Sequence, residues 1–101
     1  MARLFKKKIT FLISGGGSNL LKILEKNLKR KKFQTQSIIS NKSISLEIKK
    51  FVKSNDLDIN LYENVKIITS KILKGADLIF LLGFMRILEK KLIKNYKIIN
   101  L

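Results

Sequence analysis

The chain has 101 residues, of which 46% are hydrophobic and 29% charged, and it carries a formal net charge of +15. This length predicts one domain with a modest core, and the apolar content predicts a folded chain. The sequence contains no Cys and no His. Disulfide frameworks, thiolate chemistry and the commonest neutral-pH general base are therefore excluded from these residues, and we expect no metal site and a reducing, cytoplasmic location.

The positive charge comes mainly from Lys, which is spread over every predicted helix. Nucleic-acid footprints are usually clustered and interleaved with Arg and aromatic residues, so we expect general attraction to anions and no specific nucleic acid. No apolar run approaches the ~20 residues that a membrane-spanning helix needs. The apolar run at 9–13 is also too short for a secretion signal, so no membrane partner is expected.

Strand and helix patterns alternate along the chain. Residues 9–13 form a continuous apolar run, typical of a strand buried on both faces of a parallel sheet, and residues 19–32 place leucines on one side at helical spacing. The later elements are expected as a strand at 34–40, a helix at 45–54, a strand at 58–62, a helix at 64–73, a strand at 76–84, a helix at 85–96 and a strand from 97. This alternation predicts an α/β fold: a Rossmann-like open parallel sheet with flanking helices, in one nucleotide-binding domain over residues 1–101.

Three consecutive glycines, at 15–17, separate the first strand from its helix. At the carboxyl end of a parallel strand, bare peptide N–H groups and the helix dipole favour a phosphate or carboxylate. Ser18 adds a hydroxyl and can cap the helix. The alternative is a tight turn in which Ser18 or Asn19 is an ordinary cap.

Two familiar glycine loops do not fit this stretch. A dinucleotide fingerprint that starts at Gly15 requires a third glycine at position 20, where the chain has Leu20. A nucleoside triphosphatase loop requires Lys before its Ser, whereas Gly17 precedes Ser18. Neither a nicotinamide dinucleotide nor ATP hydrolysis is expected.

Three segments together resemble one family. "LISGGGSNL" after the first strand, "IISNK" after the second and "LLGFMRIL" at the central strand are similar in order and spacing to phosphoribosylglycinamide formyltransferase. The resemblance spans nearly the whole chain. It implies transfer of a formyl group from 10-formyltetrahydrofolate to the amine of glycinamide ribonucleotide, a step of purine biosynthesis in one-carbon metabolism.

The resemblance also implies roles for individual residues. Gly17, Ser18 and Asn19 would bind the phosphate end of the ribonucleotide, in agreement with the helix-terminus argument. The pterin ring of the folate cosubstrate would be received by Met85, Arg86, Ile87 and Leu88. For the three apolar members of that segment, plain core packing is the alternative.

The last residues, "IINL", match the family strand whose asparagine hydrogen-bonds the formyl oxygen, so Asn100 is the expected catalytic residue. Such a donor typically contributes about 3 to 4 kcal/mol of transition-state stabilisation. The family continues with a histidine two residues later and then an aspartate, and neither is present. We therefore expect the N-terminal half of a formyltransferase domain, incomplete at the C-terminus and inactive alone. No residue between 59 and 74 matches the arginine that the family has there.

Other functions remain open at this stage. The related formyltetrahydrofolate deformylases share the segment around Arg86, although "GSNL" after the glycines favours the ribonucleotide enzyme. The chain could instead be a non-enzymatic basic domain that binds anions or nucleic acid, or a degenerate product without activity. The oligomeric state is left open.

Overall fold

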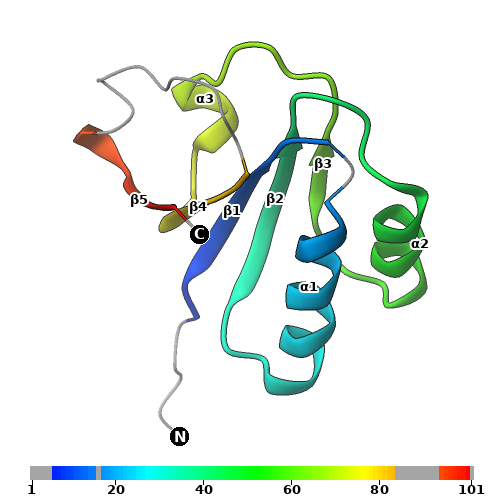
Figure 1. The fold of residues 1–101 in the computed structure, drawn as a ribbon. Coiled ribbons are helices and arrows are strands. Elements are labelled where there is room, and N and C mark those ends of the chain that lie inside the picture. The colour runs from blue at the N-terminus through cyan, green and yellow to red at the C-terminus, as the bar shows by residue number, and fades with distance from the viewer. Residues whose placement is uncertain (1–5, 16, 84–93, 101) are drawn as a thin grey trace, which may run out of the picture.

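The computed structural model describes residues 6–15, 17–83 and 94–100, and its five strands form one parallel sheet in the order β3-β2-β1-β4-β5 (Figure 1). The strands are β1 Lys8–Ile13, β2 Gln34–Ser40, β3 Asn60–Tyr62, β4 Leu78–Leu82 and β5 Lys97–Asn100. The helices are α1 Ser18–Arg30, α2 Leu46–Ser54 and α3 Ser70–Leu73. The predicted α/β fold with an open parallel sheet and flanking helices is confirmed.

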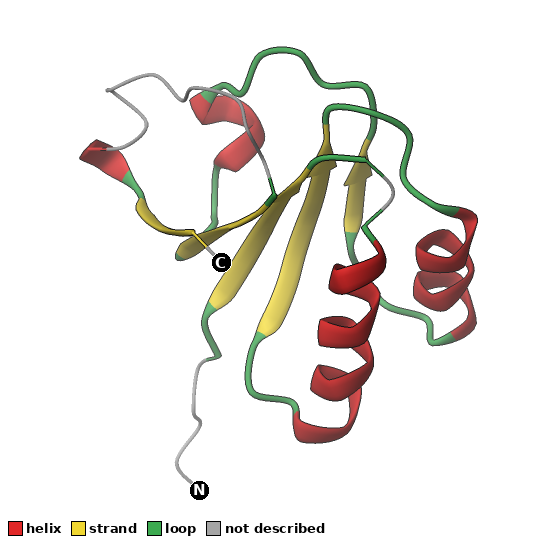
Figure 2. Cartoon of the chain, viewed as in Figure 1, coloured by secondary structure: helices red, strands yellow, loops and turns green. Residues whose placement is uncertain are grey.

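The central strand β1 is buried on both faces, as its continuous apolar run predicts. Phe11 belongs to the core on one side of the sheet, which Leu20 and Leu24 of α1 and Ile48 of α2 complete. Leu12 points to the other side, where a smaller core forms. The smaller core contains Leu12, Ile39, Ile68, Leu73 and Ile79. Helices α1 and α2 therefore cover one face and α3 covers the other (Figure 2).

The first two helices form because their apolar residues recur at helical spacing and their ends are satisfied locally. In α1 the buried side chains are Leu20 and Leu24, one turn apart, and the N–H of Lys31 closes the last turn on the Asn27 carbonyl at 2.7 Å. In α2 the Oγ of Ser45 accepts from the N–H of Ile48 at 3.3 Å, as a side-chain cap.

The helix predicted at 64–73 is much shorter in the structure, where only Ser70–Leu73 is helical. The preceding residues are held by other contacts: Asn64 has a left-handed φ of 54°, and the N–H of Val65 donates to the Ser40 carbonyl at 2.9 Å. The Oγ1 of Thr69 then caps α3 by accepting from Ile72 N–H at 3.3 Å. Tertiary hydrogen bonds to the end of β2 outweigh the weak helical preference of this segment.

The remaining elements lie where expected, with shorter bounds for β3 and β4 than the predicted 58–62 and 76–84. Most of the helix predicted at 85–96 lies outside the described residues, although positions 94 and 95 are helical. Across the described ranges, no helix combines the length and apolar character needed to cross a membrane.

Candidate functional site

The carboxyl ends of parallel strands lie at the same edge of a sheet. In Figure 1, β1, β2 and β3 point upwards to this edge, and the glycine loop lies there between β1 and α1. Binding sites of open α/β sheets form at this edge, because loops and helix N-termini converge on it. The loops after β2 and β3 leave the sheet at the same edge, towards α2 and α3 respectively (Figure 1).

Gly15 and Gly17 have the same φ and different surroundings. Each has φ of +87°, in the left-handed region that side chains rarely adopt. A Cβ on Gly17 would lie 2.8 Å from Ile48 Cδ1 and 2.9 Å from Ile13 Cδ1, whereas a Cβ on Gly15 would meet no atom of the described residues within 4 Å. Core side chains thus fill the Cβ direction of the half-buried Gly17, whereas the Cβ direction of Gly15 is open among the described residues. Gly16 lies outside the described residues.

Helix α1 presents uncapped amides beside this open space. Its first helical hydrogen bond runs from Leu21 N–H to the Gly17 carbonyl at 3.1 Å, so the N–H groups of the three residues before Leu21 have no acceptor within the helix. Ser18 and Asn19 are exposed, and the first turn contains no acidic side chain that would neutralise the helix dipole. This arrangement suits an anionic ligand.

The predicted capping role of Ser18 is wrong. Gly17 is the N-cap residue, Ser18 is the first helical residue, and no side chain caps α1. The left-handed Gly17 is the last residue before the helix, so the helix starts at Ser18. If Ser18 were the cap, the helix would start one residue later, at Asn19. The described helices α2 and α3, in contrast, have side-chain caps from Ser45 and Thr69.

The end of β2 fixes the glycine loop by two hydrogen bonds. The N–H of Gly15 donates to Asn41 Oδ1 at 3.3 Å, and the Oγ of Ser40 donates to the Gly15 carbonyl at 3.0 Å. Ser40 is fully buried, and its Oγ also accepts from Lys42 N–H at 3.1 Å. In the sequence, Ser40 and Asn41 belong to the "IISNK" segment, and the resemblance implies no role for either residue. The available sequence signal for a role was their position at the carboxyl end of β2, since this strand end lies at the same edge of the sheet as the glycines.

A carboxylate supports the same edge from β3. Glu63 Oε1 accepts from Ile44 N–H at 2.8 Å and lies 2.6 Å from Lys49 Nζ. The hydrogen bond from Lys49 and then that from Ile44 hold the pKa of Glu63 below its ordinary value. Glu63, directly after β3, is therefore tied to the loop before α2 by a hydrogen bond and to α2 by an ion pair.

Asn100 is the last residue of β5 and is exposed. In the sheet register it pairs with Leu81, which pairs in turn with Leu12, so Asn100 is level with the end of β1. With β4 between them, the two strands are about 10 Å apart at the usual ~4.8 Å spacing. Asn100 and the glycine loop thus share the carboxyl edge. The expected folate-binding residues, Met85, Arg86, Ile87 and Leu88, lie outside the described residues.

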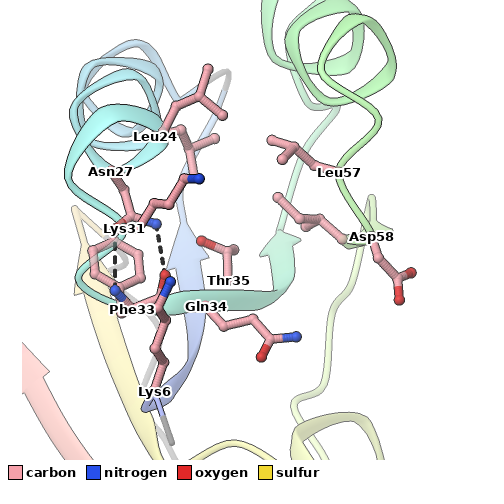
Figure 3. A pocket seen from close by; sticks show the side chains of 11 residues that line it. Lys6, Leu24, Asn27, Lys31, Phe33, Gln34, Thr35, Leu57 and Asp58 are labelled. Atoms are coloured by element: carbon pink, nitrogen blue, oxygen red, sulfur yellow. Dashed lines mark hydrogen bonds between the residues drawn. The ribbon is translucent and has the colours of Figure 1, made fainter. Parts of the chain in front are cut away.

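A cavity of about 300 Å³ lies at the opposite end of the sheet, between the end of α1, the start of β2 and the segment that leads into β3 (Figure 3). The side chain of Asn27 in this cavity is already engaged: its Nδ2 donates to the Phe33 carbonyl at 2.8 Å, and its Oδ1 accepts from Lys32 N–H at 2.9 Å. The cavity is separate from the glycine loop. In the described part of the chain, no cluster of acidic side chains could hold a metal ion.

The sequence matches no known family in a scan of protein families, and a search of curated proteins finds no match. Solved structures do match. A phosphoribosylglycinamide formyltransferase from Anaplasma phagocytophilum is 30% identical, with a TM-score of 0.67 over 94% of this chain and 48% of the enzyme. The corresponding enzyme from Coxiella burnetii is 27% identical, with a TM-score of 0.67 over 94% of this chain and 50% of the enzyme.

A glycinamide ribonucleotide transformylase from Symbiobacterium toebii matches with a TM-score of 0.72 over 98% of this chain and 54% of the enzyme, and its 21% identity bears on the fold alone. The chain spans about half the length of each of these three enzymes. The resemblance to phosphoribosylglycinamide formyltransferase that the three sequence segments indicate is confirmed by the first two structures, whose names are those of transferases and not of deformylases.

Proposed function

We propose that this chain carries the ribonucleotide-binding part of a phosphoribosylglycinamide formyltransferase. The observation that supports this most is the uncapped start of α1 beside Gly15, which presents bare amides at the sheet edge where this fold binds ligands. The similarity to two solved phosphoribosylglycinamide formyltransferases supports a ribonucleotide as the ligand. The bound molecule would be glycinamide ribonucleotide, held by its phosphate.

In this proposal the amides of Gly17, Ser18 and Asn19 receive the phosphate oxygens. Each negative charge near the helix N-terminus gains about 0.3 to 1 kcal/mol from the dipole, in addition to the charge-assisted hydrogen bonds. The high positive charge of the chain raises the local concentration of the anion without selecting it. Selectivity would come from the distance between the phosphate site and the other ligand-binding residues at the carboxyl edge of the sheet.

The reacting end of the ribonucleotide would extend along the edge towards Asn100, which is level with the end of β1. A side-chain amide there can donate to the formyl oxygen as negative charge develops on it. The formyl donor, 10-formyltetrahydrofolate, would be received by the segment that contains Arg86. The transfer also requires proton movement, which a histidine serves in the family, and these 101 residues contain none. Within these 101 residues we therefore propose the ribonucleotide-binding part of the reaction.

Calorimetry on the folded chain tests the proposal. Glycinamide ribonucleotide should bind at one site, and inorganic phosphate should compete with it. Glycinamide riboside, which lacks the phosphate, is the matched control and should not bind measurably.

The salt dependence separates this function from that of a basic nucleic-acid-binding domain. Binding of arbitrary DNA should fall steeply with salt, whereas binding at a built phosphate site should fall much less. Equal affinity for the riboside and the ribonucleotide, or no heat with either, would overturn the proposal.

A further inference from the structure

Gly15 is held by hydrogen bonds with two side chains. A Cβ at this position would meet none of the described residues within 4 Å, so packing in that direction does not fix its left-handed φ. Both of its backbone polar groups are nevertheless engaged, the N–H by Asn41 Oδ1 and the carbonyl by Ser40 Oγ. The conformation of the loop start therefore depends on two side chains that belong to the next strand.

Ser40 connects three loops at the carboxyl edge. Its Oγ donates to the loop after β1 and accepts from Lys42 N–H in the loop after β2. Its backbone carbonyl accepts from Val65 N–H in the loop after β3, at 2.9 Å. The side chain is completely buried, where a hydroxyl that is satisfied as both donor and acceptor is strongly oriented. The oriented Ser40 hydroxyl therefore restricts the position of the Gly15 carbonyl, to which it donates.

We infer that Ser40 and Asn41 are positioning residues for the glycine loop, which hold it open so that the amides of α1 can receive a phosphate. The inference rests on the proposed function for its ligand. Because the N–H of Gly15 is engaged by Asn41, that amide is withheld from the ligand, and the phosphate is directed to the helix start. Neither side chain is assigned a contact with the ribonucleotide.

The anchoring can be observed without any ligand. The chain has only five glycines, so selective 15N-glycine labelling gives a spectrum of at most five backbone amide signals. Asn41→Ala should shift the Gly15 signal and speed its hydrogen exchange severalfold, and Ser40→Ala should do the same from the carbonyl side. Asn41→Asp keeps an acceptor and should restore protection of the Gly15 amide. The Gly75 signal, from the turn before β4, reports whether each variant is folded.

Ser43→Ala is the matched control, because Ser43 is an exposed serine in the same loop as Asn41 and makes no side-chain hydrogen bond among the described residues. It should leave the Gly15 signal unchanged. An unchanged Gly15 signal in both Asn41→Ala and Ser40→Ala, with Gly75 in its folded position, would overturn the inference.

Ligand affinity gives the second measurement. Removing one anchoring hydrogen bond should weaken the binding of glycinamide ribonucleotide and of inorganic phosphate about five- to tenfold, whereas Ser43→Ala should change it less than twofold. Full affinity in Asn41→Ala despite a displaced Gly15 would also contradict a positioning role. If the wild-type chain binds neither probe while Gly15 still responds to both variants, the proposed function fails and the anchoring stands.

Discussion

Gly15 and Gly17 adopt the same φ two residues apart, yet the chain requires glycine at each for a different reason. Gly17 lies against Ile13 and Ile48, where any side chain would enter the core. Gly15 borders space that none of the described residues fills, and both of its backbone polar groups are hydrogen-bonded. The comparison shows that a glycine-rich loop can combine a packed position with an open one, and that φ alone does not distinguish them.

Gly17→Ala should have the largest effect on stability. The added methyl would overlap two isoleucine side chains, and the left-handed conformation would be strained as well. We expect a loss of about 3 kcal/mol in the free energy of unfolding, a large share of the stability of a small domain. Urea denaturation followed by circular dichroism measures it. A loss below about 1 kcal/mol would show that the neighbouring core side chains rearrange to make room for the methyl group.

Gly15→Ala should cost less, because only the backbone strain applies. We expect a loss of about 1 kcal/mol without any clash. The difference of about 2 kcal/mol between the two alanine variants, measured in the same denaturant series, sharpens the comparison. Equal losses would contradict the distinction between a packed and an open glycine.

A similar contrast exists between buried hydroxyls. The Oγ of Ser40 has two hydrogen-bond partners, whereas the fully buried Oγ1 of Thr10, on the strand that leads into the loop, has no partner among residues 6–15, 17–83 and 94–100. Thr10→Val keeps the shape and removes the unpaired group, so it should raise the unfolding free energy by about 0.5 to 1 kcal/mol. A lower melting temperature for Thr10→Val would show that this hydroxyl has a partner in solution.

The smallest expected effect concerns Glu63 on the far side of the same edge. Its pKa in the folded chain is held below the ordinary 4.5, so the ionised form stabilises the fold above that pH. This contribution should decrease as the pH falls below about 4.5 towards the pKa of the folded state. The wild type should therefore melt slightly higher than Glu63→Gln at pH 7, and the two should converge in acid. A constant difference across this range, with the exposed Glu25→Gln as control, would contradict the assignment.

Much of the fold follows from local sequence pattern. The bounds of β2 are those predicted, and the helical spacing that places Leu20 and Leu24 on one face is also the packing of α1. The helix predicted at 64–73 was too long, because apolar spacing cannot reveal that Val65 N–H is bound to the end of β2. Distant hydrogen bonds of this kind have no local signature.

In the candidate site, too, contacts between distant segments could not be predicted from local sequence pattern. The glycine run indicates a loop at the carboxyl edge, and the structure places Gly17, Ser18 and Asn19 there. Which glycine is closed by the core depends on the position of Ile48, which arrives from another helix. The anchoring by Asn41 likewise depends on the register of β1 and β2, which fixes how two distant segments meet.

The most direct test of the central claim is a titration of the uniformly 15N-labelled chain with glycinamide ribonucleotide, followed by NMR. If the amides at the start of α1 bind the phosphate, the signals of Ser18 and Asn19 should shift most, and those around Phe33 at the opposite end of the sheet should stay unchanged. Saturable shifts centred on Phe33, or no saturable shift at all in a well-folded sample, would contradict the account.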